Sequence, residues 1–165
     1  MAAPTPSARG IPDGVRLKDG FRSVVTFELN PTIAIFEREV TPPGIDGREP
    51  IDTMTMHTNR WMTKHPRQLL EMTNGSISFA YDPKVYDDIL DLINQVTVVT
   101  HTFSNGDRLS YWGFLKAFKP ESHGEGKMPM ASGELIPTNE DPNTNTEEDP
   151  VFTPGPGGTG TGTGN

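Results

Sequence analysis

The chain has 165 residues, of which 33% are hydrophobic, and it carries a formal net charge of −8 with no cysteine. This length fits one domain with a short appendage, and the composition excludes a multidomain enzyme, a collagen-like chain and a fully disordered one. The acidic balance disfavours a protein that grips nucleic-acid phosphates, and the lack of cysteine excludes disulfides and thiolate chemistry.

Shifts in composition divide the chain into three parts. Residues 1–20 are rich in proline, glycine and charge, and we expect an extended N-terminal arm there. Residues 21–136 hold the periodic hydrophobic pattern and predict one domain. Residues 137–165 contain five acidic residues, no basic one and a final Gly-Thr repeat, which predicts a flexible tail. Residues 1–10 have no apolar h-region and no apolar run approaches about 20 residues, so we expect no secretory signal, no membrane span and a soluble intracellular protein.

The hydrophobic pattern of the domain alternates with a period of two residues, which predicts β-strands. We expect strands at 21–29, 33–40, 51–58, 76–81, 96–104, 107–119 and 128–136. The turn Asn30-Pro31-Thr32 predicts a hairpin between the first two, and Asn105-Gly106 predicts another between the fifth and the sixth. Pro129 and Gly133 interrupt the last strand and place it at an edge of the sheet.

One helix is predicted, at about 83–94. Asp82 is a good N-cap, and Pro83 suits the first helical position because its missing N–H would have no partner there. The helix carries one apolar stripe, made of Val85, Tyr86, Ile89, Leu90 and Ile93. The strand segment 110–118 is apolar on both faces, so we expect the helix to pack against it. These patterns predict a mostly β, antiparallel domain with one flanking α-helix.

A long and largely irregular loop at 41–75, with the strand from Ile51 as its regular piece, separates the second strand from the helix region. Connections of this length in a small domain are usually functional or bound to a partner. Trp61 lies in it beside Arg60, and such aromatic and arginine pairs are typical of protein interfaces. Two interpretations remain open: Trp61 contacts another subunit, or it plugs one end of its own sandwich.

The residues that could carry chemistry have simpler explanations. The acidic residues of the predicted helix lie on its polar face, and the histidines are scattered without metal-ligand spacing. These residues are Asp87, Asp88 and Asp91, and His57, His65, His101 and His123. No nucleophile motif accompanies them. We therefore expect no catalytic residue, no cofactor and no metal, and a protein that is not an enzyme.

Five segments occur in a characteristic order. They are Glu-Val-Thr-Pro-Pro-Gly-Ile-Asp-Gly at 39–47, Pro-Ile-Asp-Thr-Met-Thr-Met-His at 50–57, Ala-Tyr-Asp-Pro-Lys-Val-Tyr at 80–86, Tyr-Trp-Gly-Phe-Leu-Lys-Ala-Phe-Lys-Pro at 111–120 and Ile-Pro-Thr-Asn-Glu-Asp-Pro at 136–142. Together they resemble the major tail tube proteins of long-tailed (siphovirus-type) bacteriophages. The resemblance covers the chain from Val24 to Pro142.

This resemblance implies an antiparallel β-sandwich or partial barrel with one flanking helix, a long irregular loop and extended termini. It implies hexameric rings that stack into a tail tube, the conduit for DNA ejection into the host. The implied partners are further copies of the chain, a tape measure protein inside the tube, and tail-tip and tail-terminator proteins at its ends; double-stranded DNA is present only in transit, and no membrane is involved. The implied location is the virion tail, with assembly in the host cytoplasm.

On this basis Arg48, Trp61 and Arg67 are assigned, as a hypothesis, to contacts between subunits or between rings. The acidic charge suits a conduit that must not retain DNA. The alternative is a neck or baseplate adaptor domain of a phage tail, which docks a partner without polymerising.

Overall fold

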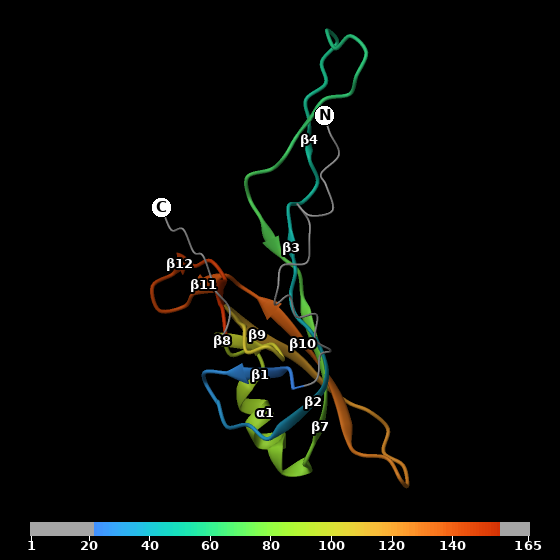
Figure 1. The fold of residues 1–165 in the computed structure, drawn as a ribbon, viewed down its shortest axis with the longest axis vertical. Coiled ribbons are helices and arrows are strands. Elements are labelled where there is room, and N and C mark those ends of the chain that lie inside the picture. Colours follow the sequence, from blue (N-terminus) through green and yellow to red (C-terminus); the bar gives the residue numbers. More distant parts are fainter. Residues whose placement is uncertain (1–21, 156–165) are drawn as a thin grey trace.

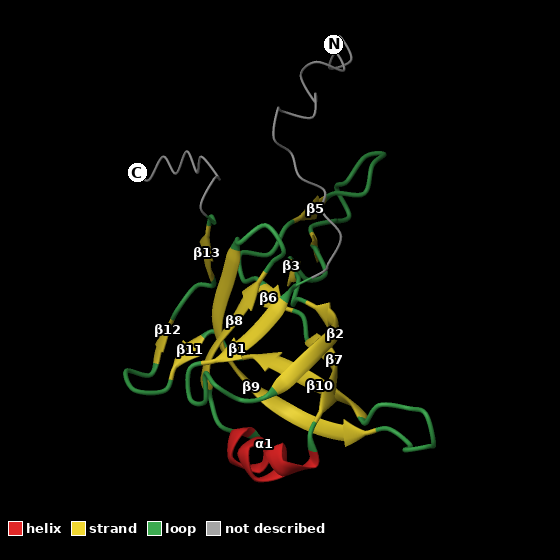
Figure 2. Ribbon diagram, turned by 60° about the horizontal axis from the view of Figure 1, so that its bottom comes forward, coloured by secondary structure: helices red, strands yellow, loops and turns green. Residues whose placement is uncertain are grey.

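The structure, a computed structural model, describes residues 22–155; the expected N-terminal arm at 1–20, Phe21 and the end of the tail at 156–165 lie outside this range. The predicted fold class is confirmed: the protein is mostly β and antiparallel, with one short helix (Figures 1 and 2). The main sheet consists of β1 (Val24–Phe27), β2 (Ile35–Thr41), β7 (Gly75–Tyr81), β8 (Thr97–Thr102), β9 (Arg108–Pro120), β10 (Met130–Pro137) and β13 (Val151–Thr153). Its order is β1-β8-β9-β10-β7-β2, and β13 pairs with β9.

Three two-stranded ladders lie outside the main sheet. They are β3 (Ile45–Asp46) with β6 (Glu71–Met72), β4 (Ile51–Asp52) with β5 (Lys64–His65), and β11 (Glu140–Asp141) with β12 (Thr146–Glu147). The first two stand along one projection from the body, and the third forms a separate hairpin after β10 (Figure 1).

The sheet curls into a partial barrel whose two end strands, β1 and β2, lie beside each other without a backbone ladder. One side chain bridges them, because the Glu37 carboxylate accepts a hydrogen bond from the Val25 amide at 2.9 Å. The hairpin predicted from 21 to 40 is therefore wrong: β1 pairs with β8 and β2 pairs with β7. The physical reason is that the connection 28–34 is longer than the two to five residues that fix a hairpin register.

The hairpin predicted around Asn105-Gly106 is confirmed. β8 and β9 pair from Thr97 opposite Gly113 to Thr102 opposite Arg108, and Gly106 adopts a φ of 92° that its lack of a Cβ permits. On β9 the register against β10 shifts at Lys116, which is an extra residue in that strand. Because a bulge reverses the alternation of side chains, Leu115 and Phe118 both turn to the core.

The prediction that the last strand lies at an edge is wrong, since β10 runs between β9 and β7. Pro129 precedes β10 and so removes no ladder hydrogen bond from it. A Cβ at Gly133 would lie 3.0 Å from Leu115 Cδ1 and 3.1 Å from Ile77 Cγ1. This glycine therefore makes room for core side chains and does not mark an edge.

The helix begins as predicted. The Asp82 side chain accepts the Lys84 amide at 3.0 Å, and a 3₁₀ turn (η1, Pro83–Val85) leads into α1 (Tyr86–Leu92). The helix is shorter than predicted, and its stripe is shifted: Leu92 is buried, whereas Leu90 is exposed. The 3₁₀ turn is wound more tightly than an α-helix and so rotates the face that points to the core. The buried residues of this segment are therefore Val85, Ile89 and Leu92.

The helix lies across one end of the barrel (Figure 2), and just after it the Asn94 amide donates to the Leu115 carbonyl of β9 at 3.0 Å. The expected packing against this strand is confirmed. The core thus forms between the inner face of the sheet and the helix. Its fully buried members include Phe27, Phe79, Ile89, Leu92, Val99 and Leu135.

The sequence predicts a flexible tail from residue 137, but the structure forms β11, β12 and β13 within it. β13 pairs its residues Val151–Thr153 with Ser110, Leu109 and Arg108 of β9. The Gly155 amide then donates to Asp107 Oδ1 at 2.7 Å. The acidic composition concealed these strands because they are held by backbone ladders and bury little apolar surface. The division of the chain into arm, domain and tail stays a prediction.

Candidate assembly surfaces

Residues 44–72, here called the long hairpin, project from the body (Figure 1). Ile45 pairs with Met72 at the base, and Ile51 pairs with His65 further out. The sequence predicted an irregular loop at 41–75 with a strand over 51–58, so this expectation is corrected in two ways. The loop is an extended hairpin, and its strand β4 ends at Asp52 because residues beyond Thr53 turn back to form the tip.

Polar contacts hold the long hairpin in shape. Arg48 adopts a left-handed φ of 63° between β3 and β4, and its Nε lies 3.5 Å from Glu71 Oε2. Arg67 Nε donates to the Glu49 carbonyl at 2.7 Å. Two of the three residues predicted for subunit contact therefore bind partners within their own hairpin, where they position it.

The tip of the long hairpin, residues 53–63, displays its apolar side chains to solvent. Over residues 44–71 every side chain is exposed except those of Thr53 and Thr58, which are partly buried. The Thr53 hydroxyl is hydrogen bonded to that of Thr63 across the hairpin, and the Thr58 hydroxyl accepts the Thr55 amide within the turn. Trp61 is 74% exposed, and the Arg60 guanidinium lies over its ring at 5.5 Å. Met54, Met56 and Met62 are exposed around it. Trp61 therefore does not plug the body, and the structure excludes that interpretation.

The tip and the segment 64–67 that follows it concentrate positive charge in an acidic protein. Residues 53–67 contain Arg60, Lys64 and Arg67, together with two histidines, and no acidic residue. An apolar and cationic surface on a projecting segment has the composition of a protein-binding site.

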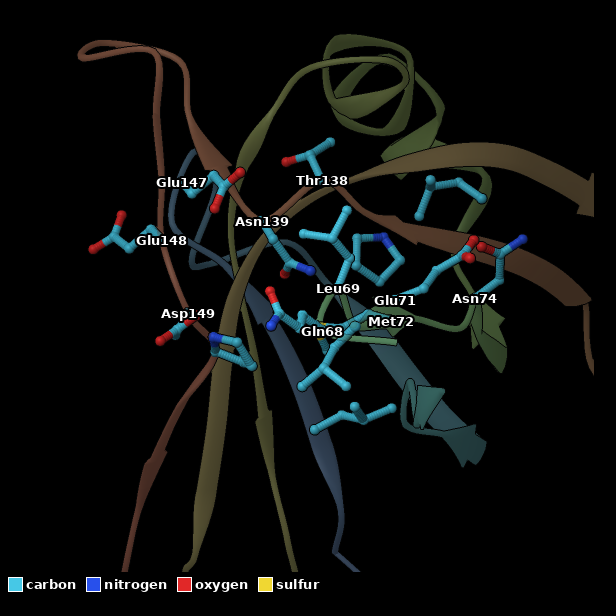
Figure 3. A pocket seen from close by; sticks show the side chains of 15 residues that line it. Gln68, Leu69, Glu71, Met72, Asn74, Thr138, Asn139, Glu147, Glu148 and Asp149 are labelled. Carbon is cyan, nitrogen blue, oxygen red and sulfur yellow. The ribbon is translucent and has the colours of Figure 1, made fainter. Parts of the chain in front are cut away.

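A second surface is a groove of about 560 Å³ at the base of the long hairpin (Figure 3). One wall is residues 68–74 with Ile45, and the other is the segment 136–150. We call residues 138–149, which contain β11 and β12, the C-terminal hairpin. The groove is lined by Ile45, Gln68, Leu69, Leu70, Glu71, Met72, Asn74, Ile136, Pro137, Thr138, Asn139, Glu147, Glu148, Asp149 and Pro150.

The C-terminal hairpin is fixed to the body through Trp112. The Trp112 carbonyl accepts the amides of Thr138 and Asn139, at 2.8 and 3.3 Å, and its indole Nε1 donates to the Glu148 carboxylate. This leaves Glu147 and Asp149 as exposed carboxylates on the groove wall, and among residues 22–155 neither has a hydrogen-bonded or ionic partner. The composition of residues 137–165, five acids without a base, was the signal for this surface, but the sequence did not show what it faces.

Displaced pKa values occur at groups inside the body, away from both surfaces. His101 and Tyr111 are buried and stack at 5.6 Å, with His101 Nε2 2.9 Å from the tyrosine hydroxyl. Burial lowers the pKa of His101 to about 4 and raises the pKa of Tyr111. The hydrogen bond to Tyr86 and burial raise the pKa of Tyr81, whose hydroxyl lies 3.2 Å from His123 Nε2. These groups lie within the barrel and at its helix-covered end, and none of them lines the groove or the tip.

The remaining candidate residues are dispersed. His57 and His65 lie on the long hairpin, and Asp87, Asp88 and Asp91 are exposed on the helix, as expected for its polar face. Within residues 22–155, no three histidine or acidic side chains are grouped so as to hold a metal ion. In the same range, no helix has the length and apolar character to cross a membrane.

No model of a known protein family matches the sequence, and no curated protein sequence matches it. Solved structures share the fold. A chain from the virion of a native gene transfer agent particle superposes with a TM-score of 0.57 at 10% identity, over 82% of this chain and 98% of that chain. A chain from the baseplate of the anti-feeding prophage, solved with six-fold symmetrisation, gives a TM-score of 0.53 at 11% identity, over 80% and 91%. At these identities the likeness concerns the fold.

Proposed function

We propose that this chain is a structural component of a phage-like tail, and that it is the tail tube subunit, which forms hexameric rings stacked into a DNA conduit. The observation that carries the proposal is the pairing of a small barrel with a long hairpin that is exposed along its length. Such a hairpin has no core of its own, and a two-stranded hairpin is marginally stable in water. It therefore suits contact with another subunit.

The fold likeness supports the same proposal from another side. The gene transfer agent chain is matched over nearly its whole length, and the particle it comes from is a virion. The baseplate containing the second chain was averaged with six-fold symmetry. A ring of six copies is a closed heterologous assembly, and a further contact along its axis extends it into a filament.

The predicted interface residues take distinct roles in this proposal. Trp61 makes the direct contact, since it is exposed at the tip. Arg48 and Arg67 position the hairpin through Glu71 and the Glu49 carbonyl. The net charge of −8 keeps DNA phosphates from binding to the conduit. The role is mechanical and needs no catalysed reaction, cofactor or metal.

Purified protein should form rings or tubes at high concentration, visible by negative-stain electron microscopy, with hexamers detected by analytical ultracentrifugation. Trp61→Ala should impair polymerisation while circular dichroism stays unchanged, because the side chain contributes nothing to the core. Phe36→Ala, which removes an exposed aromatic residue from β2, is the matched control and should assemble normally. A wild-type protein that stays monomeric at every concentration contradicts the tube proposal.

The second candidate is a neck or baseplate adaptor, favoured by the fold likeness to the baseplate chain. An adaptor would dock one partner or form a single ring and would not stack. Single rings that never lengthen as the concentration rises would select this candidate over the tube.

A further inference from the structure

The groove at the base of the long hairpin has chemistry opposite to that of the tip. One wall carries Glu147 and Asp149 without partners among residues 22–155, and the other exposes Leu69 and Leu70, each 68% accessible. The tip carries Arg60, Trp61 and methionines, and residues 53–67 contain no acid. Each surface thus offers an apolar patch beside charge, and the charges are of opposite sign.

The C-terminal hairpin adds an electrostatic reason for a cationic occupant. Glu140 lies directly opposite Glu147 in the β11–β12 ladder, and residues 137–155 hold five acids and no base. Like charges directly opposite each other destabilise a strand pair. A bound cation would relieve this repulsion, and the dispersed acids form no metal site within residues 22–155.

The groove of one molecule cannot receive the tip of the same molecule. The β3–β6 ladder lines the groove itself, and the β4–β5 ladder lies between the groove and the tip along the long hairpin (Figure 1). With strands rising about 3.3 Å per residue, the hairpin holds the tip well away from its own base. A tip that occupies the groove must therefore belong to a second copy.

We propose that the groove binds the tip of the long hairpin of a second copy of this chain, in a head-to-tail contact. Trp61 and the methionines cover Leu69 and Leu70, while Arg60 faces Glu147 and Asp149. Because each molecule carries one tip and one groove, the contact repeats without limit and produces an open chain of subunits. The inference rests on the proposed function in that this contact would join one ring to the next.

Charge reversal in two matched variants tests the contact. The tip variant Asn59→Glu/Arg60→Glu makes tip and groove both acidic, and the groove variant Glu147→Arg/Asp149→Arg makes both basic. Each variant alone should associate about tenfold to hundredfold more weakly than the wild type. The two variants mixed, or all four changes on one chain, should restore association, since opposite charges meet again.

Sedimentation velocity at low and high salt measures these outcomes. The control Glu125→Arg/Lys127→Glu reverses charges in the exposed loop between β9 and β10 and should change nothing. Circular dichroism confirms that each variant folds. Failure of the mixture to recover association overturns the inference, as does a groove variant that assembles like the wild type.

The outcomes separate this inference from the proposed function. Tubes that form regardless of the groove charges refute the groove contact and leave the tube proposal standing. Salt-sensitive open chains that never contain rings support the groove contact and refute the tube proposal. A fluorescent 30-base-pair duplex tests a nucleic-acid role for the tip: DNA binding that is lost in the tip variant, while self-association persists, overturns the inference.

Discussion

The barrel and the long hairpin differ in what holds them together. The barrel buries a continuous set of large side chains, including Phe27, Phe79 and Leu135, which are at most 1% exposed. The long hairpin has Met72 at its base as its buried apolar residue, and its described contacts are short ladders and polar bonds. The barrel is therefore specified by its own core. The hairpin carries large apolar side chains that bring no stability to the single chain, which indicates that they act elsewhere.

The largest effect that would sharpen this comparison is expected in the barrel core. Phe79 packs its ring 5.9 Å from Phe118 and 6.4 Å from Tyr81. Phe79→Ala should lower the free energy of unfolding by about 3–5 kcal/mol, because it removes buried surface and leaves a cavity. Urea denaturation measures the change, with Phe36→Ala on the exposed side of β2 as the control. A loss below about 1 kcal/mol would mean that the core is not packed as described.

Acidification should lower the free energy of unfolding through the buried His101 of the barrel. The pKa of His101 is about 4 in the folded protein and about 6.5 when unfolded, so between these values the unfolded state binds a proton that the folded state does not. Stability should be fully retained above pH 6.5 and fall by about 3 kcal/mol as the pH drops to 4.

The His101→Gln variant isolates this contribution from the carboxylates. Its urea midpoint should depend less on pH over this window than that of the wild type, whatever its absolute stability. Equal pH dependence in the two proteins would show that His101 becomes protonated without cost in the fold.

A smaller effect is expected at the start of the helix. Asp82→Ala removes the acceptor of the Lys84 amide and should cost about 1 kcal/mol of stability. Asp91→Ala serves as the control, because its carboxylate caps no backbone group in the described part of the chain. Thermal unfolding followed by circular dichroism distinguishes the two, and equal melting temperatures would contradict the capping role.

The smallest effect on stability is expected at the tip of the long hairpin. Trp61→Ala should change the free energy of unfolding by less than about 0.5 kcal/mol, since a side chain that is 74% exposed loses little on truncation. The same change should impair self-assembly. A loss of stability comparable to that of Phe79→Ala would remove the contrast between the two regions.

The sequence predicted best where the local pattern and the packing agree. The alternation of Ile77, Phe79 and Tyr81 gave β7, the Asn105-Gly106 turn gave the β8–β9 hairpin, and Asp82 marked the start of the helix. Each of these signals lies within a few residues of the structure it specifies.

The predictions of strand pairing and strand position were wrong where residues far apart in the sequence determine the structure. The turn at 30–32 reverses the chain, but β1 and β2 pair with β8 and β7, which lie far along the sequence. Gly133 resembled a strand breaker, although it accommodates Leu115 and Ile77. The groove could not be predicted because it joins residues 68–74 to residues 136–150 across the fold. Among the candidate site residues, Trp61 could be selected from the sequence because it is an aromatic residue beside an arginine. Glu147 and Asp149 entered the sequence analysis only as part of the acidic residue count of 137–165.

The hydrogen bond between the Glu37 carboxylate and the Val25 amide marks the place where the barrel opens most easily. Ladder hydrogen bonds reinforce one another along a pair of strands, whereas this junction of β1 and β2 depends on one carboxylate and on packing beneath it. The sheet can part there while β7 to β10 stay joined. A barrel built in this way can adjust its curvature at one junction without losing the ladders of its other strands.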